Sequence, residues 1–376
     1  MSEMSYLEKL LDGVEVEWKT LGQTCKIETG KLNANAAVDD GEYMFFTTAK
    51  ETSKIDKFRW DTEALLIAGN ANVGEVKHYI GKFEAYQRTY VLTNFDENVS
   101  VRFLYFVLSH SLKKYLEERT NSAAMTYIVL STLENFPIPI PCPDNPEKSL
   151  AIQSEIVRIL DKFTALTAEL TAELNMRKKQ YNYYRDQLLS FKDGEVEWKT
   201  LGEVAQFKRG TAITQKQTTP GEIPVVANGP IPTYFHSESN RQGETIVIAR
   251  SGAYAGYVSF WNQPIFLTDA FSVHSDLKIV KPKFIYHVLQ NKQEHIHAMK
   301  KGAGVPHVRV KEFETYDIPI PPITEQERIV SILDKFDTLT NSITEGLPRE
   351  IELRQKQYEY YRDLLFSFPK PETVSK

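Results

Sequence analysis

Two short acidic-x-lysine sequences have the spacing of half of a magnesium-dependent nuclease site. They are residues 17–19 (Glu-Trp-Lys) and 75–77 (Glu-Val-Lys), and Asp61 lies upstream of the second. A strand with alternating charged faces produces the same pattern. Where residues 75–77 align with a later part of the chain, that part reads Tyr-Val-Ser (257–259), which could not hold a metal. We therefore interpret both sequences as strands, and we predict no metal site and no catalytic residues.

Other catalytic signatures are also missing from the sequence. There is no GxxxxGK phosphate loop and no Asn/Asp-Pro-Pro-aromatic sequence of the kind that amino-methyltransferases use to hold a target base. His295 and His297 are two residues apart, so on a helix they point to different sides. Cys25 and Cys142 have no metal-type spacing and fit a reducing compartment. The sequence therefore shows no catalytic constellation.

Composition is that of an ordinary globular protein. The chain has 376 residues, of which 41% are hydrophobic and 25% charged, and this length allows two or three domains. It has neither an apolar run long enough to span a membrane nor an apolar leader at its start, so we expect a cytoplasmic protein. The net charge of −5 argues against a free-standing, non-specific nucleic-acid binder, which needs surplus cations.

Several blocks of the sequence occur twice in the same order. Residues 156–163 (IVRILDKF) return as 329–336 (IVSILDKF), and the block EVEWKTLG occurs at 15–22 and again at 195–202. The chain therefore consists of a block, a variable unit and a helix, followed by a second block, variable unit and helix. The simplest closed arrangement of such a chain has a pseudo-two-fold axis. We therefore expect antiparallel helices and chain termini that lie near one another.

The repeated helix carries an apolar stripe at steps of three and four residues. About forty residues form a rod of roughly 60 Å, and the simplest partner for each copy is the other copy, in a two-stranded coiled coil. In the second copy, four extra residues that include Gly346 and Pro348 should break or kink the helix. The stripe consists of Ile152, Ile156, Ile159, Phe163, Leu166, Leu170 and Leu174 in the first copy, and Ile329, Ile332, Phe336, Leu339 and Ile343 in the second.

Two variable units, residues 23–135 and 203–315, share a skeleton of strand, glycine turn, strand and helix. Both end in a proline-alternating strap, at 136–141 and 317–322, which should be an extended and stiff connector. The scaffold is copied while the loops differ. This pattern indicates one architecture that presents two recognition surfaces.

This arrangement resembles the specificity (S) subunit of type I restriction–modification enzymes over essentially the whole chain. The strap leading into the repeated helix (138–161 and 318–334) and the block before each unit carry the resemblance. Residues 302–307 (GAGVPH) also match that family, whereas the equivalent residues 122–127 (SAAMTY) depart from it.

The resemblance implies an α+β fold with two pseudo-two-fold-related α/β target recognition domains, joined by two long antiparallel helices that form a coiled coil. Each domain would read one half of an asymmetric bipartite DNA target. The helices would set the gap and dock two methyltransferase (M) subunits, which restriction (R) subunits then join. S-adenosylmethionine, ATP and Mg would be bound by the partner subunits, and this chain would bind no cofactor.

On this interpretation the chain divides into six parts. They are an N-terminal helix (1–12), target recognition domain 1 (13–141), a central helix (142–192), target recognition domain 2 (193–322), a C-terminal helix (323–368) and a tail (369–376).

Candidate DNA contacts are loop residues whose side chains suit base edges, since Arg and Lys pair with guanine, and Asn and Gln with adenine. A solvated or backbone-bonding surface group is the alternative for each of them. The candidates are Lys31, Asn33, Asn35, Asn70, Asn72 and Arg88 in the first unit, and Lys208, Arg209, Lys216, Asn228, Arg250, Ser251, Tyr254 and Arg309 in the second.

Copied aromatic and arginine residues near the helix ends are candidates for docking a protein partner, with packing between the helices as the alternative. They are Tyr181, Tyr184, Arg185, Tyr358, Tyr361 and Arg362. Two other functions stay open at this point. One is a coiled-coil scaffold that reads no DNA sequence, and the other is a self-sufficient restriction or methylation enzyme.

Overall fold

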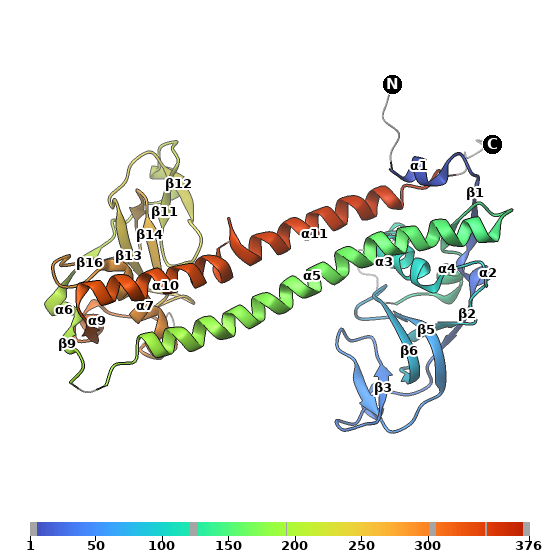
Figure 1. Ribbon diagram of the computed structural model, residues 1–376, viewed down its shortest axis with the longest axis horizontal. Helices are drawn as coiled ribbons and strands as arrows, with labels where there is room; N and C mark the ends of the chain where they lie inside the picture. The colour runs from blue at the N-terminus through green and yellow to red at the C-terminus, as the bar shows by residue number, and fades with distance from the viewer. Residues whose placement is uncertain (1–5, 120–126, 193, 301–305, 343, 371–376) are drawn as a thin grey trace. The chain divides into compact units, whose positions relative to one another are not determined.

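The structure is a computed structural model that describes residues 6–119, 127–192, 194–300, 306–342 and 344–370. The chain forms two compact units (Figure 1). Unit 1 consists of residues 1–169 and 351–376, and unit 2 of residues 170–350. Each unit therefore contains one variable unit and parts of both long helical segments. None of the helices in the described ranges is long and apolar enough to cross a membrane.

Unit 1 is built on a six-stranded sheet whose pairings are antiparallel except between β3 and β6. In spatial order the strands are β2 (Lys26–Thr29), β7 (Thr89–Thr93), β5 (Trp60–Ala68), β6 (Val76–Ala85), β3 (Tyr43–Phe46) and β4 (Ser53–Ile55). The helices α1 (Tyr6–Leu11), α2 (Leu21–Thr24), η1 (Ala34–Ala36), α3 (Val101–Arg119) and α4 (Leu130–Glu134) complete it.

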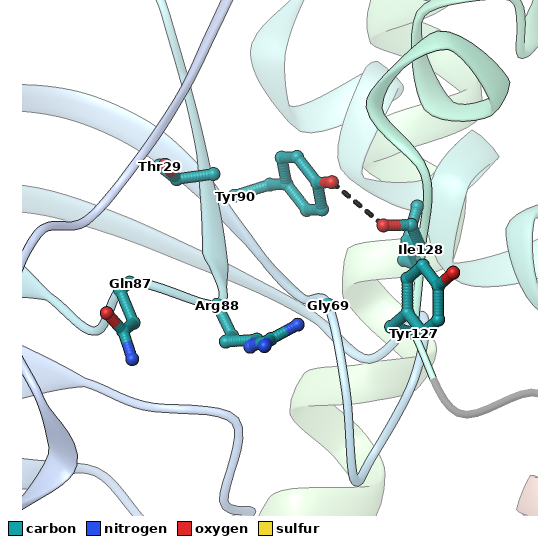
Figure 2. A pocket seen from close by; sticks show the side chains of 7 residues that line it. All are labelled: Thr29, Gly69, Gln87, Arg88, Tyr90, Tyr127 and Ile128. Atoms are coloured by element: carbon teal, nitrogen blue, oxygen red, sulfur yellow. Dashed lines mark hydrogen bonds between the residues drawn. The ribbon is translucent and has the colours of Figure 1, made fainter.

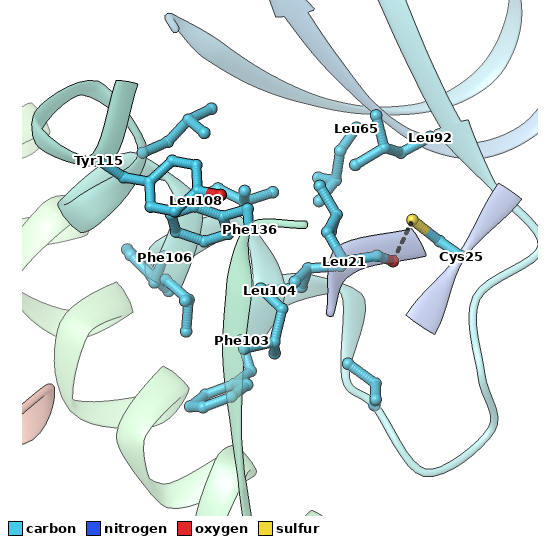
Figure 3. Close-up of a cluster of buried hydrophobic side chains, with 14 of the residues drawn as sticks. Leu21, Cys25, Leu65, Leu92, Phe103, Leu104, Phe106, Leu108, Tyr115 and Phe136 are labelled. Atoms are coloured by element: carbon cyan, nitrogen blue, oxygen red, sulfur yellow. Dashed lines mark hydrogen bonds between the residues drawn. The ribbon is translucent and has the colours of Figure 1, made fainter. Parts of the chain in front are cut away.

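The core of unit 1 lies between α3 and the sheet (Figure 3). Phe103, Leu104 and Leu108 of α3 are fully buried with Leu65 and Leu92 of the sheet. The helix buries these residues because apolar side chains three and four apart share one face. The sequence had predicted this helix and the strands β5 and β6, and the structure confirms all three.

Unit 2 repeats most of this order of elements, around two smaller sheets in place of one. One has the order β10 (Ala205–Arg209), β16 (Ala270–Ser275), β13 (Glu244–Ala249) and β14 (Val258–Asn262), and the other β12 (Tyr234–His236), β11 (Ile223–Val226) and β15 (Phe266–Leu267). Its helices outside the long segments are α6 (Leu201–Val204), η2 (Gln215–Gln217), α7 (Pro282–Asn291), α8 (Gln293–Ala298) and α9 (Val310–Glu314).

Each proline strap pairs with a copied EVEWKTLG block. In unit 1, β8 (Pro137–Pro141) is antiparallel to β1 (Val16–Thr20), and in unit 2, β17 (Asp317–Ile320) is antiparallel to β9 (Glu197–Thr200). A two-stranded ribbon tolerates proline because each strand has an outer edge that needs no hydrogen bond. The predicted extended strap is confirmed. Its pairing with the block was not predicted.

The long helices are α5 (Pro146–Leu188), α10 (Ile323–Asn341) and α11 (Gly346–Leu365). Within unit 1, Phe163 stacks on Tyr361 with ring centroids 5.4 Å apart. Within unit 2, Phe336 stacks on Tyr181 and Tyr184 at 6.0 and 5.6 Å. In each unit the beginning of one helix copy therefore packs against the end of the other copy, which is the antiparallel pairing that the repeats predicted.

The predicted interruption of the second copy is present between Asn341 and Gly346, where α10 ends and α11 begins. Gly346 has φ +79°, a left-handed conformation that glycine adopts without strain. Pro348 lies in the first turn of α11, where a missing N–H costs nothing. The break therefore precedes the proline. Ile343 of the predicted stripe lies outside the described residues.

A buried glutamine joins each long helix to its domain. The side-chain oxygen of Gln153 accepts a hydrogen bond from the backbone N–H of Ser100 at 2.8 Å, and that of Gln326 accepts one from Lys281 at 2.9 Å. Both side chains are fully buried. The glutamine occurs in both copies of the repeated sequence, but the sequence does not indicate that it bonds to the backbone of the domain.

Candidate nucleic-acid interface

Strand register brings three loops of unit 1 to one end of the sheet. Thr29 at the end of β2 pairs with Tyr90, and Ala68 at the end of β5 pairs with Thr89 at the beginning of β7. The loops that follow β2 and β5 and the turn before β7 therefore lie side by side. These loops carry all six candidate DNA contacts of unit 1, namely Lys31, Asn33, Asn35, Asn70, Asn72 and Arg88.

A pocket of about 280 Å³ opens where these loops meet (Figure 2). Its floor is fixed by hydrogen bonds, because the Tyr90 hydroxyl donates to the Ile128 carbonyl at 2.9 Å and the Ile128 N–H donates to the Gly69 carbonyl at 2.8 Å. The Arg88 side chain extends toward Gly69 in Figure 2. The lining residues are Thr29, Gly69, Gln87, Arg88, Tyr90, Tyr127 and Ile128.

Unit 2 has a pocket of about 410 Å³ at the equivalent place. Arg209 pairs with Phe271 as Thr29 does with Tyr90, and Ala249 pairs with Ala270 as Ala68 does with Thr89. The isolated bridge between Asn70 and Tyr127 recurs between Ser251 and His307. The pocket is lined by Arg209, Arg250, Phe271, His307, Val308, Arg309, Val310 and Lys311.

The two pockets share a position but differ in charge. Thr29 and Gly69 of unit 1 correspond to Arg209 and Arg250 of unit 2, and Tyr127 corresponds to His307. The unit 2 pocket therefore offers Arg and Lys donors on several sides, whereas the unit 1 pocket combines one arginine with Gln87 and a threonine. Divergent linings on one scaffold can select different polar partners.

A hydrogen-bonded cluster holds the turn that begins at Arg250. The side-chain oxygen of Asn228 accepts hydrogen bonds from the backbone N–H groups of Arg250 and Ser251 at 2.8 and 3.1 Å. The Asn228 amide donates to Asp269 at 2.5 Å, and the Ser251 hydroxyl donates to the same carboxylate oxygen at 2.9 Å. Asn228 and Ser251 therefore position the turn.

Arg241 secures the end of strand β10 beside this pocket. Its guanidinium donates to the Ser272 hydroxyl at 2.7 Å and to the backbone carbonyl of Arg209 at 2.8 Å. Burial lowers the pKa of Arg241 below its ordinary value. The residue is a structural arginine that fixes the backbone from which Lys208 and Arg209 project.

The other candidates of the two units are placed unequally. Lys31, Asn33, Asn35 and Lys208 are exposed but do not line the pockets, and Tyr254 is exposed on the turn after Arg250. Lys216 lies in η2 and does not line the unit 2 pocket. The Asn72 amide donates to the Thr48 carbonyl at 2.7 Å, so Asn72 is tied to the scaffold. The side-chain oxygen of Asn70 is buried with no hydrogen-bond partner among the described residues.

Sequence reasoning missed several residues of the pockets. Gln87 and Tyr127 line the unit 1 pocket, and His307 and Lys311 line that of unit 2. Asp269, which faces Arg250, was also missed. Alignment of the two units could have found them, because Tyr127 and His307 occupy equivalent places just before α4 and α9.

The candidate docking residues divide into buried and exposed members. Tyr181 is only 6% exposed and stacks on Phe336, so its ring packs between helices, which was the alternative to docking. Tyr184 and Tyr361 keep 46% and 40% of their surface exposed. Arg185 donates to the Asn291 side chain at 3.0 Å, which ties α5 to α7.

The remaining two docking candidates lie together near the end of α11. Tyr358 is half-buried, and burial raises its pKa. Arg362 lies over the Tyr358 ring at 5.7 Å and forms an ion pair with Asp363 at 2.8 Å.

Of the two acidic-x-lysine sequences, residues 17–19 lie in β1, whereas Glu75 directly precedes β6 and only Val76 and Lys77 belong to that strand. Lys77 Nζ donates to the carbonyls of Ala49 and Lys50 at 2.8 and 2.7 Å, and residues 17–19 pair with the proline strand β8. Within the ranges that the structure describes, no three His, Cys, Asp or Glu side chains are grouped to hold a metal ion.

Known proteins resemble this chain both in sequence and in fold. The family model described as type I restriction modification DNA specificity domain matches residues 13–177 and again 194–353. The chain is 45% identical over 414 aligned positions to the type I restriction enzyme EcoR124I/EcoR124II specificity subunit of Escherichia coli, with 100% of both chains covered. It is 37% identical to the EcoprrI specificity subunit of Escherichia coli, over 92% of this chain and 93% of that one.

A solved structure has the same fold. The S subunit of a type I restriction-modification system from M. genitalium superposes with a TM-score of 0.71 over 96% of this chain and 98% of that one, at 20% sequence identity.

Proposed function

Because the chain belongs to the type I restriction–modification DNA specificity family, and is thus the non-catalytic DNA sequence-recognition subunit of such a complex, we propose that each variable domain reads one half of an asymmetric bipartite target. The observation that carries this proposal is the pair of pockets at equivalent positions with different linings. Equivalent positions suit the local two-fold symmetry of the duplex backbone, and different linings suit two different half-sites.

The long helices have two roles in this proposal. They set the number of base pairs between the half-sites, and their exposed, copied aromatic residues Tyr184 and Tyr361 contribute to docking two methyltransferase (M) subunits. Restriction (R) subunits then join the complex. The partners bind S-adenosylmethionine, ATP and Mg and perform adenine-N6 methylation and DNA cleavage, and the complex acts in the cytoplasm, where its DNA is.

A domain exchange tests the two-reader model. Residues 203–315 are replaced by the equivalent unit of a relative, and methylated adenines are mapped by single-molecule sequencing of the host genome. We expect a new sequence in one half of the target and no change in the other. A target altered in both halves would contradict the model.

Two further experiments separate this proposal from its alternatives. The purified chain alone, incubated with DNA, Mg and S-adenosylmethionine, should neither cut nor methylate, whereas a self-sufficient enzyme would do so. With the methyltransferase subunit present, the chain should select a defined sequence from random duplexes, and a mere scaffold would select none.

A further inference from the structure

Arg250 lines the unit 2 pocket from a position that no cation occupies in unit 1. In unit 2, Arg250 directly follows β13. The equivalent residue in unit 1 is Gly69, where an added Cβ would lie 2.5 Å from the Arg88 carbonyl oxygen and 3.1 Å from the Tyr90 ring. No side chain fits there without movement of the backbone. The unit 1 cation is instead Arg88, which directly precedes β7.

Asp269 of unit 2 occupies the place that Arg88 has in unit 1, since Asp269 precedes Ala270 as Arg88 precedes Thr89. One Asp269 carboxylate oxygen, Oδ2, accepts hydrogen bonds from Asn228 and Ser251. The other, Oδ1, lies 3.7 Å from Nη1 of Arg250. The carboxylate is therefore fixed by neutral donors on one side and faces the guanidinium on the other.

The backbone of Arg250 is held by hydrogen bonds on both sides, and its side chain remains accessible. Its backbone N–H is bound by Asn228 at 2.8 Å, and its backbone carbonyl accepts a hydrogen bond from Val308 at 3.0 Å. Its side chain is 53% exposed and lines the pocket. These bonds fix the backbone from which the Arg250 side chain projects, and the Asp269 carboxylate lies on one side of its guanidinium.

We propose that Arg250, oriented by Asp269, reads a guanine in the half-site of unit 2. A guanidinium has donors only, and the major-groove edge of guanine presents two acceptors, O6 and N7, in a bidentate arrangement that no other base offers. The neighbouring Arg209, Arg309 and Lys311 add positive charge that favours the approach of DNA phosphates. Asp269 is a positioning residue, because its charge restricts where the guanidinium points.

The unit 1 pocket predicts a different selection. Its lining residues within the described ranges include no carboxylate, and Arg88 lies beside Gln87. A dependence of base selection on an arginine–aspartate pair should therefore be confined to the half-site of unit 2. Arg88 provides a matched control residue on the same scaffold.

The experiment uses the full chain in complex with the methyltransferase subunit of its own system, and it rests on the proposed function. Binding is measured to duplexes in which each target position is varied in turn. Arg250→Ala should lower binding to the cognate duplex about 10- to 100-fold through one guanine of one half-site, and at that position the variant should accept all bases nearly equally. Replacement of that guanine by 7-deazaguanine should weaken the wild type and leave Arg250→Ala unchanged.

Two other variants complete the test. Asp269→Asn should keep most of the affinity but reduce discrimination at the same position. Arg250→Lys keeps the charge and can still pair with guanine, but it lacks the planar fork of donors, so it should retain a weakened preference for guanine. Arg88→Ala should leave that position unaffected. Retained selection of the unit 1 half-site by the Arg250 variants shows that they are folded.

Failure of the Arg250 inference and failure of the proposed function would give different results. If Arg250→Ala weakens every duplex equally and no position is relaxed, Arg250 contacts only phosphate and the inference is overturned. If the wild-type complex selects no bipartite sequence, the proposed function itself is wrong.

Discussion

The side-chain oxygen of Gln326 accepts a hydrogen bond from the backbone N–H of Lys281, the N-cap residue of α7, at 2.9 Å. Its amide nitrogen donates to the carbonyls of Ile279 and Pro321 at 3.1 and 2.8 Å. One fully buried side chain thus satisfies three backbone groups where the domain meets α10. Gln153 makes the equivalent bonds in unit 1, to Ser100 and Asn98.

Replacement of Gln326 by leucine should therefore destabilise the protein. The variant keeps the volume but leaves buried backbone groups without partners, so we expect the free energy of unfolding to fall by about 3 kcal/mol. Urea unfolding followed by circular dichroism measures it. Gln153→Leu should have an effect of similar size. Gln263→Leu on an exposed turn is the control, with a change within about 0.5 kcal/mol, and equal effects of the buried and exposed changes would contradict the assignment.

Asp334 gives the stability of unit 2 a pH dependence. Its carboxylate is bound by Lys283 at 2.7 Å and by His287 at 2.8 Å. Burial by itself raises the pKa of this carboxyl, but the hydrogen bonds from His287 and Lys283 lower it below its ordinary value. A carboxyl with a lowered folded-state pKa stabilises the fold above its unfolded pKa of about 3.9 and loses that contribution as the pH falls through the folded value.

Asp334→Asn should accordingly be less stable than the wild type at pH 7, and the difference should shrink as the pH falls below about 4. Unfolding free energies measured at a series of pH values for both proteins give this difference directly. Asp186→Asn, on an exposed face of α5, serves as the control. A wild-type advantage that stayed constant down to the lowest pH would show that charge has no part in it.

The sequence alone predicted the elements that depend on local pattern and repetition. The stripe from Ile152 to Leu174 required a helix, and the reciprocal stacking of Phe163 and Phe336 on copied tyrosines follows once two copies pair antiparallel. The break before Gly346 followed from four additional residues in one copy. These features are visible because periodicity and duplication are properties of the chain itself.

The pockets could not be predicted in the same detail, because they depend on strand register and turn geometry. Nothing local shows that Thr29, Gly69 and Tyr127 meet, or that Asp269 faces Arg250. The type of a side chain also does not reveal its hydrogen-bond partner. Asn72 and Asn228 were suitable base readers by type, yet their amides bind Thr48 and Asp269.

The two cysteines should differ sharply in reactivity. Cys25 is 9% exposed with Sγ 3.6 Å from the Leu21 carbonyl oxygen, and burial raises the pKa of its thiol to about 12. Cys142 is only partly buried. Because the thiolate is the reactive form, native protein at pH 8 should react with a thiol reagent at Cys142 and not at Cys25. Peptide mapping after alkylation tests this, and a denatured sample, in which both cysteines should react, is the control.

The length of α5 should set the gap between the half-sites. Residues 167–170 and 171–174 both read Thr-Ala-Glu-Leu, and a further copy inserted after Leu170 would add about 6 Å and turn the helix only about 40° beyond a full turn. The apolar stripe then keeps its face. We expect the mapped target to gain about one base pair in the gap, with both half-sites unchanged. Insertion of only two residues turns the helix by about 200°, which moves the stripe to the opposite face and should abolish modification. A gap that stayed the same after the four-residue insertion would rule out α5 as the spacer.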